Sequence, residues 1–222
     1  MPEAGDDIDD ADRVAALADR HRSAWQRTLE DTESLAEQRG ADGWETLVIP
    51  AGDTAPEPPD AGETDRFGLA HVVPGNFADD FEELTDGDPG FGSYNVYRAE
   101  NDGRVFVTTE LIDEDDALAV YVVGTYQLRY AGDLIQTAVE QNRMYTHIQR
   151  LDGSRVASIV HQDPEKFFPH VDRFVDDTDA DGDTDADDDT DADDNTDADD
   201  DTDDEASGVE TAPGDGSPDD EA

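Results

Sequence analysis

Residues 117–128 read ALAVYVVGTYQL, and this run is apolar on both sides of an extended chain over much of its length. A strand with one face in water would alternate apolar with polar residues instead. Here two apolar sets interleave: Leu118, Val120 and Val122 on one side, and Tyr121 and Val123 on the other. The run therefore predicts a central strand whose two faces are both covered.

Turn signals on either side of this strand predict hairpins. Asn-Asp-Gly and Asp-Gly sequences supply the positive φ angles that tight hairpin turns require. Such turns separate apolar runs at two places in the chain. The predicted strands are 94–99 and 105–112 around Asn101-Asp102-Gly103, and 144–151 and 155–160 around Asp152-Gly153.

The remaining elements are helices and two shorter strands. Residues 44–49 and 67–73 predict strands, with a loop rich in Pro, Gly and acidic residues at 50–63 between them. Helical spacing predicts helices at 77–84 and 131–142. Hairpins with interposed helices indicate an α+β fold with a mainly antiparallel sheet, a long N-terminal helix and a second helix packed on the sheet.

The long helix spans residues 9–39 in this prediction. Its apolar and aromatic positions recur at spacings of three and four or their multiples, which places them on one face: Val14, Leu17, His21, Trp25, Thr28 and Leu35. We expect this face, through Val14, Leu17 and Trp25, to cover one side of the central strand or to bind a partner chain. The helix at 131–142, through Leu134, Ile135 and Val139, would cover the other side.

Composition divides the chain into a body and a tail. Residues 177–206 repeat Asp-Thr-Asp-Ala-like hexads, and such a segment has too little apolar surface to offset the entropy of ordering. We expect a disordered N-terminus at 1–8, a single α+β domain at 9–170 and a disordered polyacidic tail at 171–222.

Charge is the dominant compositional feature. The chain has 61 Asp and Glu against 14 Lys and Arg, a net charge of −47, and no Cys. Self-repulsion at this density opposes folding in dilute buffer but is screened in molar salt, where the Debye length is about 3 Å. The composition therefore predicts a haloadapted, cytoplasmic protein. The absence of a basic stripe argues against nucleic acid as a partner, and the apolar runs are too short to span a membrane.

Candidate metal sites are weak. Asp177, Asp179 and Asp181 match the opening of a calcium-binding loop, but an Asp-rich repeat produces this match without a site, so we expect only loosely bound cations there. The hairpin register predicts that His147 lies opposite Ser158 and His161 opposite Met144, which places the two His on opposite faces unless a bulge intervenes. We therefore expect no metal and no cofactor.

Catalytic motifs are also lacking: the Ser residues lie in no nucleophile elbow, and there is no phosphate-binding glycine loop. Aromatic and Arg residues on predicted strands and the long helix could instead form a binding surface. The candidates are Trp25, Tyr97, Tyr126, Arg129 and Arg143. The alternative for these residues is cross-strand packing and pairing of Arg with carboxylates.

Three stretches resemble an uncharacterised family of halophilic archaeal proteins that has no assigned activity: DRFGLAHVVPGNF (65–77), YNVYRAENDGRVFV (94–107) and RMYTHIQRLDGSRVASIVHQDPEKFFP (143–169). The resemblance implies a source and a fold but no site residues. We expect a non-enzymatic module that binds another protein or associates with itself. The alternative is a small-ligand-binding or hydrolytic enzyme whose site is not visible in the sequence.

Overall fold

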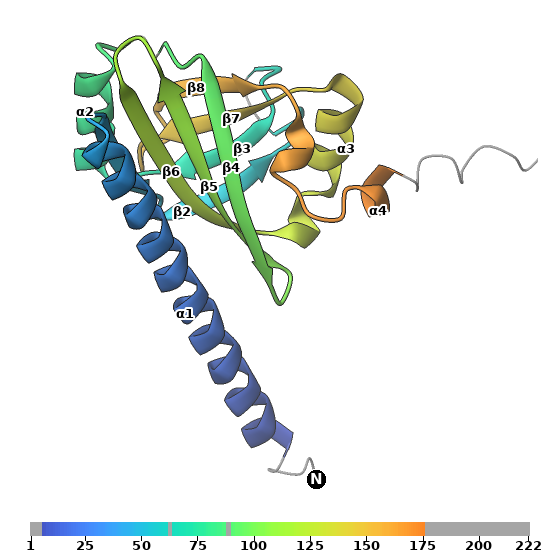
Figure 1. The fold of residues 1–222 in the computed structure, drawn as a ribbon. Helices are drawn as coiled ribbons and strands as arrows, with labels where there is room; N and C mark the ends of the chain where they lie inside the picture. Colours follow the sequence, from blue (N-terminus) through green and yellow to red (C-terminus); the bar gives the residue numbers. More distant parts are fainter. Residues whose placement is uncertain (1–5, 62–63, 88–89, 176–222) are drawn as a thin grey trace, which may run out of the picture. The chain divides into compact units, whose positions relative to one another are not determined.

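The run at 117–128 forms strand β6 (Leu118–Gln127) of an α+β fold, as predicted. A computed structural model of the protein describes residues 6–61, 64–87 and 90–175 (Figure 1). The other elements, in chain order, are α1 (Asp6–Ala41), β1 (Glu45–Pro50), β2 (Asp53–Glu57), β3 (Gly68–Val72), α2 (Gly75–Leu84), β4 (Ser93–Asn101), β5 (Arg104–Asp113), η1 (Leu128–Tyr130), α3 (Gly132–Gln141), β7 (Met144–Gln149), β8 (Arg155–His161), η2 (Pro164–Lys166) and α4 (Asp172–Val175).

The strands form two four-stranded sheets rather than one. The first sheet has the order β1-β6-β5-β4, so β6 lies inside it as expected of a central strand. The second has the order β2-β3-β7-β8. The β1–β6 and β3–β7 pairs are parallel and the other pairings are antiparallel. Each parallel pair joins strands far apart in the chain, because a parallel pair needs a long connection.

Both faces of β6 are covered, which confirms the central prediction. Leu118, Val120 and Val122 face the space between the sheets, where they join a buried cluster with Phe81 of α2 and Ile148 of the second sheet; Ile49 of β1 belongs to the same cluster. Ala119 and Tyr121 face outward and pack with Ala36 of α1 and with Leu35, Trp44 and Val48.

The elements that cover β6 differ from the expected ones. The second sheet and α2, not the helix at 131–142, cover Val120 and Val122. Leu134 and Ile135 of α3 instead join a cluster with Val105 and Tyr126 at the other end of the two sheets. On the outer face the covering part of α1 is its C-terminal half. Val14, one of the three residues predicted to cover the central strand with Leu17 and Trp25, is 67% exposed. The prediction is therefore wrong for Val14.

Three boundaries also differ from the prediction. Strand β2 lies inside the segment predicted as a loop. It contains Pro56, which is tolerated because β2 is an edge strand. Helix α1 begins at Asp6, before the predicted start. At the other end, Val171 and Phe174 pack against the core, so the tail does not begin at residue 171. Residues 176–222, with Asp177, Asp179 and Asp181, lie outside the described residues.

The register of the first hairpin follows from its turn. Asp102 and Gly103 have φ angles of 51° and 74°, as a two-residue turn with both central residues at positive φ requires. In the second hairpin His147 pairs with Ser158 and Met144 with His161, the register that the sequence predicts. The register shifts by one residue between Ile148 and Gln149, so Gln149 pairs with Arg155 and not with Val156, the partner that the predicted two-residue turn requires.

Candidate functional site

Glu110 of β5 is a buried carboxylate on the outer face of the first sheet, where α1 crosses it. Its side chain is 2% exposed, and four donors surround it. Oε1 accepts hydrogen bonds from Arg39 Nε at 2.9 Å and Tyr121 Oη at 3.0 Å. Oε2 accepts them from Asn95 Nδ2 at 2.8 Å and Tyr97 Oη at 3.1 Å. Helix α1, β4 and β6 therefore all meet at this one side chain.

The four donors keep Glu110 ionised. Burial alone would raise the pKa of this carboxyl, but the hydrogen bonds from Asn95, Tyr121, Arg39 and Tyr97 hold the pKa below its usual value. Each oxygen already accepts two hydrogen bonds. Glu110 therefore has little capacity left to act as a base or to bind a cation, and its role is to fix α1 on the sheet and to position Tyr97.

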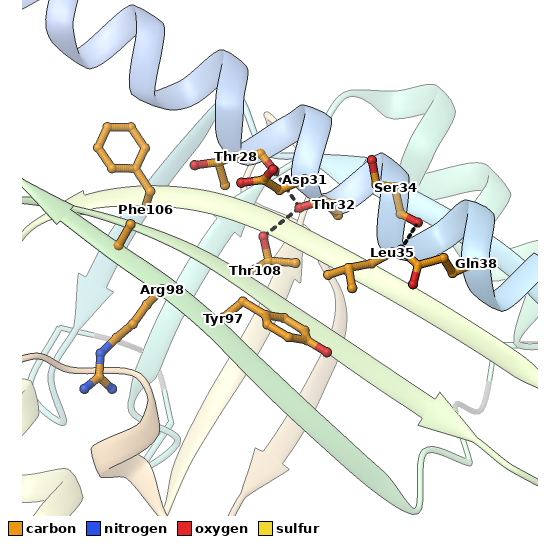
Figure 2. A pocket seen from close by; sticks show the side chains of 11 residues that line it. Thr28, Asp31, Thr32, Ser34, Leu35, Gln38, Tyr97, Arg98, Phe106 and Thr108 are labelled. Atoms are coloured by element: carbon orange, nitrogen blue, oxygen red, sulfur yellow. Dashed lines mark hydrogen bonds between the residues drawn. The ribbon is translucent and has the colours of Figure 1, made fainter.

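A groove runs beside this network, between α1 and the edge strand β4 (Figure 2). It has a volume of about 380 Å³ and adjoins a smaller hollow of about 210 Å³ at Glu110. The hydroxyls of Thr32 and Thr108 share a hydrogen bond of 2.9 Å within the groove, and Phe106 beside them is buried. The other lining residues include Thr28, Asp31, Leu35, Gln38, Tyr97, Arg98 and Ala99.

Tyr97 is the aromatic side chain that this groove presents to solvent. It is 41% exposed, yet its hydroxyl is held by Glu110. The neighbouring Arg98 turns the other way and donates to the backbone oxygens of Glu165 and Lys166. A half-exposed aromatic ring with a fixed tip loses little rotamer entropy on binding, which is the property of an interface anchor.

Helix α1 continues past this groove toward its N-terminus (Figure 1). His21 still contacts Phe106, with ring centroids 6.4 Å apart, and Arg20 bonds Asp102 of the β4–β5 turn at 2.9 Å. Residues 12–20, which we call the α1 overhang, are exposed except for half-buried Leu17. The face that packs on the sheet in the C-terminal half of α1 therefore continues into the overhang with little cover.

The structure does not bring the predicted surface residues together. Trp25 lies on α1 and is half-buried, and Tyr97 lines the groove on β4. Tyr126 is 2% exposed and donates to the Phe167 oxygen at 2.8 Å, so it is a core residue. Arg129 stacks on Tyr130, and Arg143 lies over Phe67 with 5.6 Å from guanidinium carbon to ring centroid. Tyr97 alone of the five lines the groove.

Two histidines lie in the space between the sheets. His71 Nδ1 is 3.1 Å from Thr54 Oγ1, and His161 Nε2 is 2.8 Å from Thr146 Oγ1. Their other ring nitrogens are buried with no hydrogen-bond partner among the described residues. Burial, with a smaller contribution from neighbouring histidines, lowers the pKa of each to about 3, so both are neutral.

Gly124 of β6 makes room for His71. A Cβ at this position would lie 2.6 Å from His71 Nδ1 and 2.3 Å from Thr54 Oγ1. His147, by contrast, lies on the outer face of the second sheet, stacked on Tyr145 with ring centroids 5.7 Å apart. The prediction that His147 and His161 face opposite sides is therefore confirmed.

Sequence reasoning missed Glu110 and the groove. The signal for Glu110 was present, because a charged residue stands within the apolar run 105–112 and shares its face with Thr108. A charge on a covered strand face needs partners. Those partners are distant in the sequence: Arg39 is 71 positions away. The groove depends on how α1 lies across β4, which no local pattern encodes.

Neither a metal centre nor a membrane-spanning helix is found in the described ranges. No cluster of three or more His, Asp or Glu side chains there is arranged to hold a metal ion. No helix in those ranges is long and apolar enough to cross a membrane.

Comparison with known proteins places the chain in a family without assigning an activity. No curated protein matches the sequence, and no solved structure matches it. Residues 11–169 match a family of unknown function (DUF7529). The match runs from α1 through η2 and includes Glu110, the groove and the α1 overhang. The chain therefore belongs to this family of unknown function, DUF7529.

Proposed function

We propose that this chain is a non-enzymatic protein-binding module of a halophilic archaeal cytoplasm, and that it contacts its partner through the α1 overhang and the adjoining groove. The observation that carries the proposal is the continuation of the α1 packing face beyond the sheet. Thr32 and Ala36 on this face are buried, whereas Val14 on the same face is 67% exposed. An apolar helix face that leaves its own sheet is a common element of protein recognition.

Charge on α1 supports the same surface. Between residues 12 and 31 the helix has four Arg and four carboxylates, on a chain whose net charge is −47. Arg13, Arg20 and Arg27 recur every seven residues and so lie on one flank of the apolar face. This row leads from the overhang to the groove, which begins at Thr28. A partner helix with carboxylates along one flank would complement it.

A second copy of the chain complements the row less well. In an antiparallel pair of α1 helices the same flanks meet, which would bring the Arg rows together. In a parallel pair the Arg row would meet the opposite flank, where Ala18, Trp25 and Thr32 offer no carboxylate. Charges at the flanks of paired helices determine which helices pair. The Arg row on α1 therefore favours another protein as the partner over a second copy of this chain.

Site-specific photo-crosslinking tests the proposed surface. A benzophenone side chain at Val14 should crosslink one partner in extracts prepared in molar KCl. The same group at Ser23, which is exposed on the opposite side of α1, should not. The change Arg27→Glu should reduce the Val14 crosslink without lowering the melting temperature. Equal crosslinking from both positions would contradict the proposal. A crosslinked homodimer would show that the surface binds a second copy of the chain and not another protein.

The haloadapted setting has a separate test. Screening by salt should favour the folded state of so acidic a chain. Circular dichroism should therefore show a melting temperature that rises from dilute buffer to molar KCl. A melting temperature that does not change over this range would remove the argument for a high-salt cytoplasm and leave the binding surface untouched.

The alternative function, a small-ligand-binding or hydrolytic protein, draws its support from the other sheet. There His147 and Ser158 line a polar pocket, with His147 Nδ1 and Ser158 Oγ 2.9 Å apart.

A further inference from the structure

A polar pocket of about 610 Å³ opens on the outer face of the second sheet. Strands β2, β7 and β8 contribute to it, together with the turn before β8 and the segment before β3. This is the size range of pockets that hold small molecules. Its lining brings both charge signs and several hydroxyls together: Glu57, Arg66, His147, Ser154, Arg155 and Ser158.

The hydrogen bonds of His147 determine what Ser158 can do. His147 Nε2 lies 3.0 Å from the backbone oxygen of Arg66, which can only accept, so Nε2 holds the ring proton. Nδ1 then accepts from the Ser158 hydroxyl at 2.9 Å. Burial, aided by the charges of Arg155 and Arg66, lowers the pKa of His147 to about 4, so the ring is neutral. The Ser158 proton is therefore committed to His147, and the oxygen offers its lone pairs to a ligand.

Arg66 is the cation of this pocket that has no carboxylate partner among the described residues. Arg155 is held by both oxygens of Glu57, at 3.0 and 3.1 Å. Within the part of the chain that the structure describes, the guanidinium of Arg66 lies over an aromatic ring, 5.8 Å from the centroid of Tyr145. On a chain with 61 acidic residues, an Arg at a pocket without such a partner is the natural position for the negative group of a ligand.

We propose that this pocket binds a small hydroxylated anion: Arg66 pairs with its phosphate or carboxylate, and Ser158 accepts a hydrogen bond from its hydroxyl group. The site lies on the second sheet, whereas the proposed protein-binding surface lies on α1 and the first sheet, so either can fail without the other.

The same geometry favours binding over hydrolysis. A His that activates a Ser nucleophile works best when its pKa is near the working pH. His147 titrates far below that, and its second nitrogen faces a backbone oxygen instead of a carboxylate that would stabilise the imidazolium. Arg66 and Arg155 disfavour the imidazolium further. Ser158 is therefore a ligand-contacting hydroxyl and not a nucleophile.

Calorimetry with glycerol 3-phosphate as the probe tests the proposal, using the full chain in molar KCl. Glycerol 3-phosphate should bind at one saturable site, about tenfold more tightly than inorganic phosphate, because one further hydrogen bond is worth about that factor. Glycerol alone should not bind. A second titration with glycerate shows whether the pocket prefers a carboxylate or a phosphate. The proposal is supported if either probe binds saturably and if this binding depends on Arg66 and Ser158.

Three variants separate the two contacts. Arg66→Gln should weaken glycerol 3-phosphate at least tenfold, whereas Arg129→Gln, at an exposed Arg outside the pocket, should leave the affinity unchanged. Ser158→Ala should abolish the preference over inorganic phosphate and keep the affinity for phosphate itself. Melting curves establish that each variant is folded. Absence of saturable binding by both probes in the folded wild type, or an Arg66→Gln variant that binds like wild type, would overturn the proposal.

Discussion

The outer face of the first sheet and the space between the sheets bury ionisable groups in opposite ways. Glu110 remains charged on the outer face because four donors replace its lost hydration. His71 and His161 between the sheets remain neutral, and among the described residues each has one side-chain partner, a Thr hydroxyl. Burial of a charge is tolerated when it is paired, and a group that cannot be paired gives up its charge instead.

Moving a carboxylate between these regions should have the largest effect. Val120→Asp places a carboxylate between the sheets, among apolar neighbours that offer no donors. We expect a loss of about 5 kcal/mol or more, enough to unfold a domain of ordinary stability. Val160→Asp introduces the same side chain at a position that is 50% exposed and should cost little. Circular dichroism of both variants in molar KCl decides this, and a folded Val120→Asp protein would contradict the assignment of β6 as a covered strand.

Removing the paired carboxylate should have the next largest effect. Glu110→Ala leaves the half-buried Arg39 guanidinium and the buried Tyr121 hydroxyl without their acceptor. We expect a loss of about 3–5 kcal/mol in the free energy of unfolding by urea. Glu110→Gln retains one acceptor and should lose less. The matched control is Glu114→Ala at an exposed position, which should change stability by about 0.5 kcal/mol or less.

The two regions should respond to acid in separate pH ranges. His71 and His161 between the sheets have folded pKa values of about 3, and His147 on the outer face of the second sheet has one of about 4, all below the 6.5 of an exposed His. As pH falls below 6.5 the unfolded chain takes up protons that the folded chain does not, so stability is lost. The loss is about 1.4 kcal/mol per pH unit for each His.

Glu110 contributes below this range. Its folded pKa is lower than the usual 4.5, so the stability it provides is present above pH 4.5 and is lost as pH falls through the folded value. Urea titrations at pH 6.5 and 5 isolate the histidines. Between pH 6.5 and pH 5, the free energy of unfolding of His161→Gln should fall by about 2 kcal/mol less than that of the wild type. If both proteins lose the same amount, His161 is not buried as a neutral ring.

The smallest effect on stability should come from the uncharged hydrogen bond between Thr32 and Thr108 in the groove. Thr108→Val removes one hydroxyl of the Thr32–Thr108 bond and should cost about 1 kcal/mol. Thr32 keeps its bond to the Thr28 oxygen, so it is not left unpartnered. The double change Thr32→Val with Thr108→Val should cost less than the sum of the single changes, which a double-mutant cycle measures. Additive costs would mean that the two hydroxyls do not interact.

Local pattern was enough to predict the β6 faces, the register of the first hairpin and the His147–Ser158 pairing of the second, because turn residues and period-two alternation are encoded within a few positions. The register shift at Gln149 was not predicted. The division into two sheets was not predictable, since the β1–β6 and β3–β7 parallel pairs join segments far apart in the chain. Strand β2 was missed because Asp53–Glu57 is acidic and contains Pro56. Of the candidate surface, Tyr97 was predicted but its anchor Glu110 was not, because the Arg39 partner is non-local.

The position of α1 in the chain has a consequence for folding kinetics. Its contacts with the first sheet join residues separated by 82 positions at Arg20–Asp102, 76 at Thr32–Thr108 and 71 at Arg39–Glu110. Contacts of such high sequence separation form slowly, because a long loop must close first. During synthesis α1 leaves the ribosome well before β5 and β6 exist. Its apolar face then has no sheet to cover and is exposed to chaperones along its whole length until the hairpin that carries Glu110 is complete.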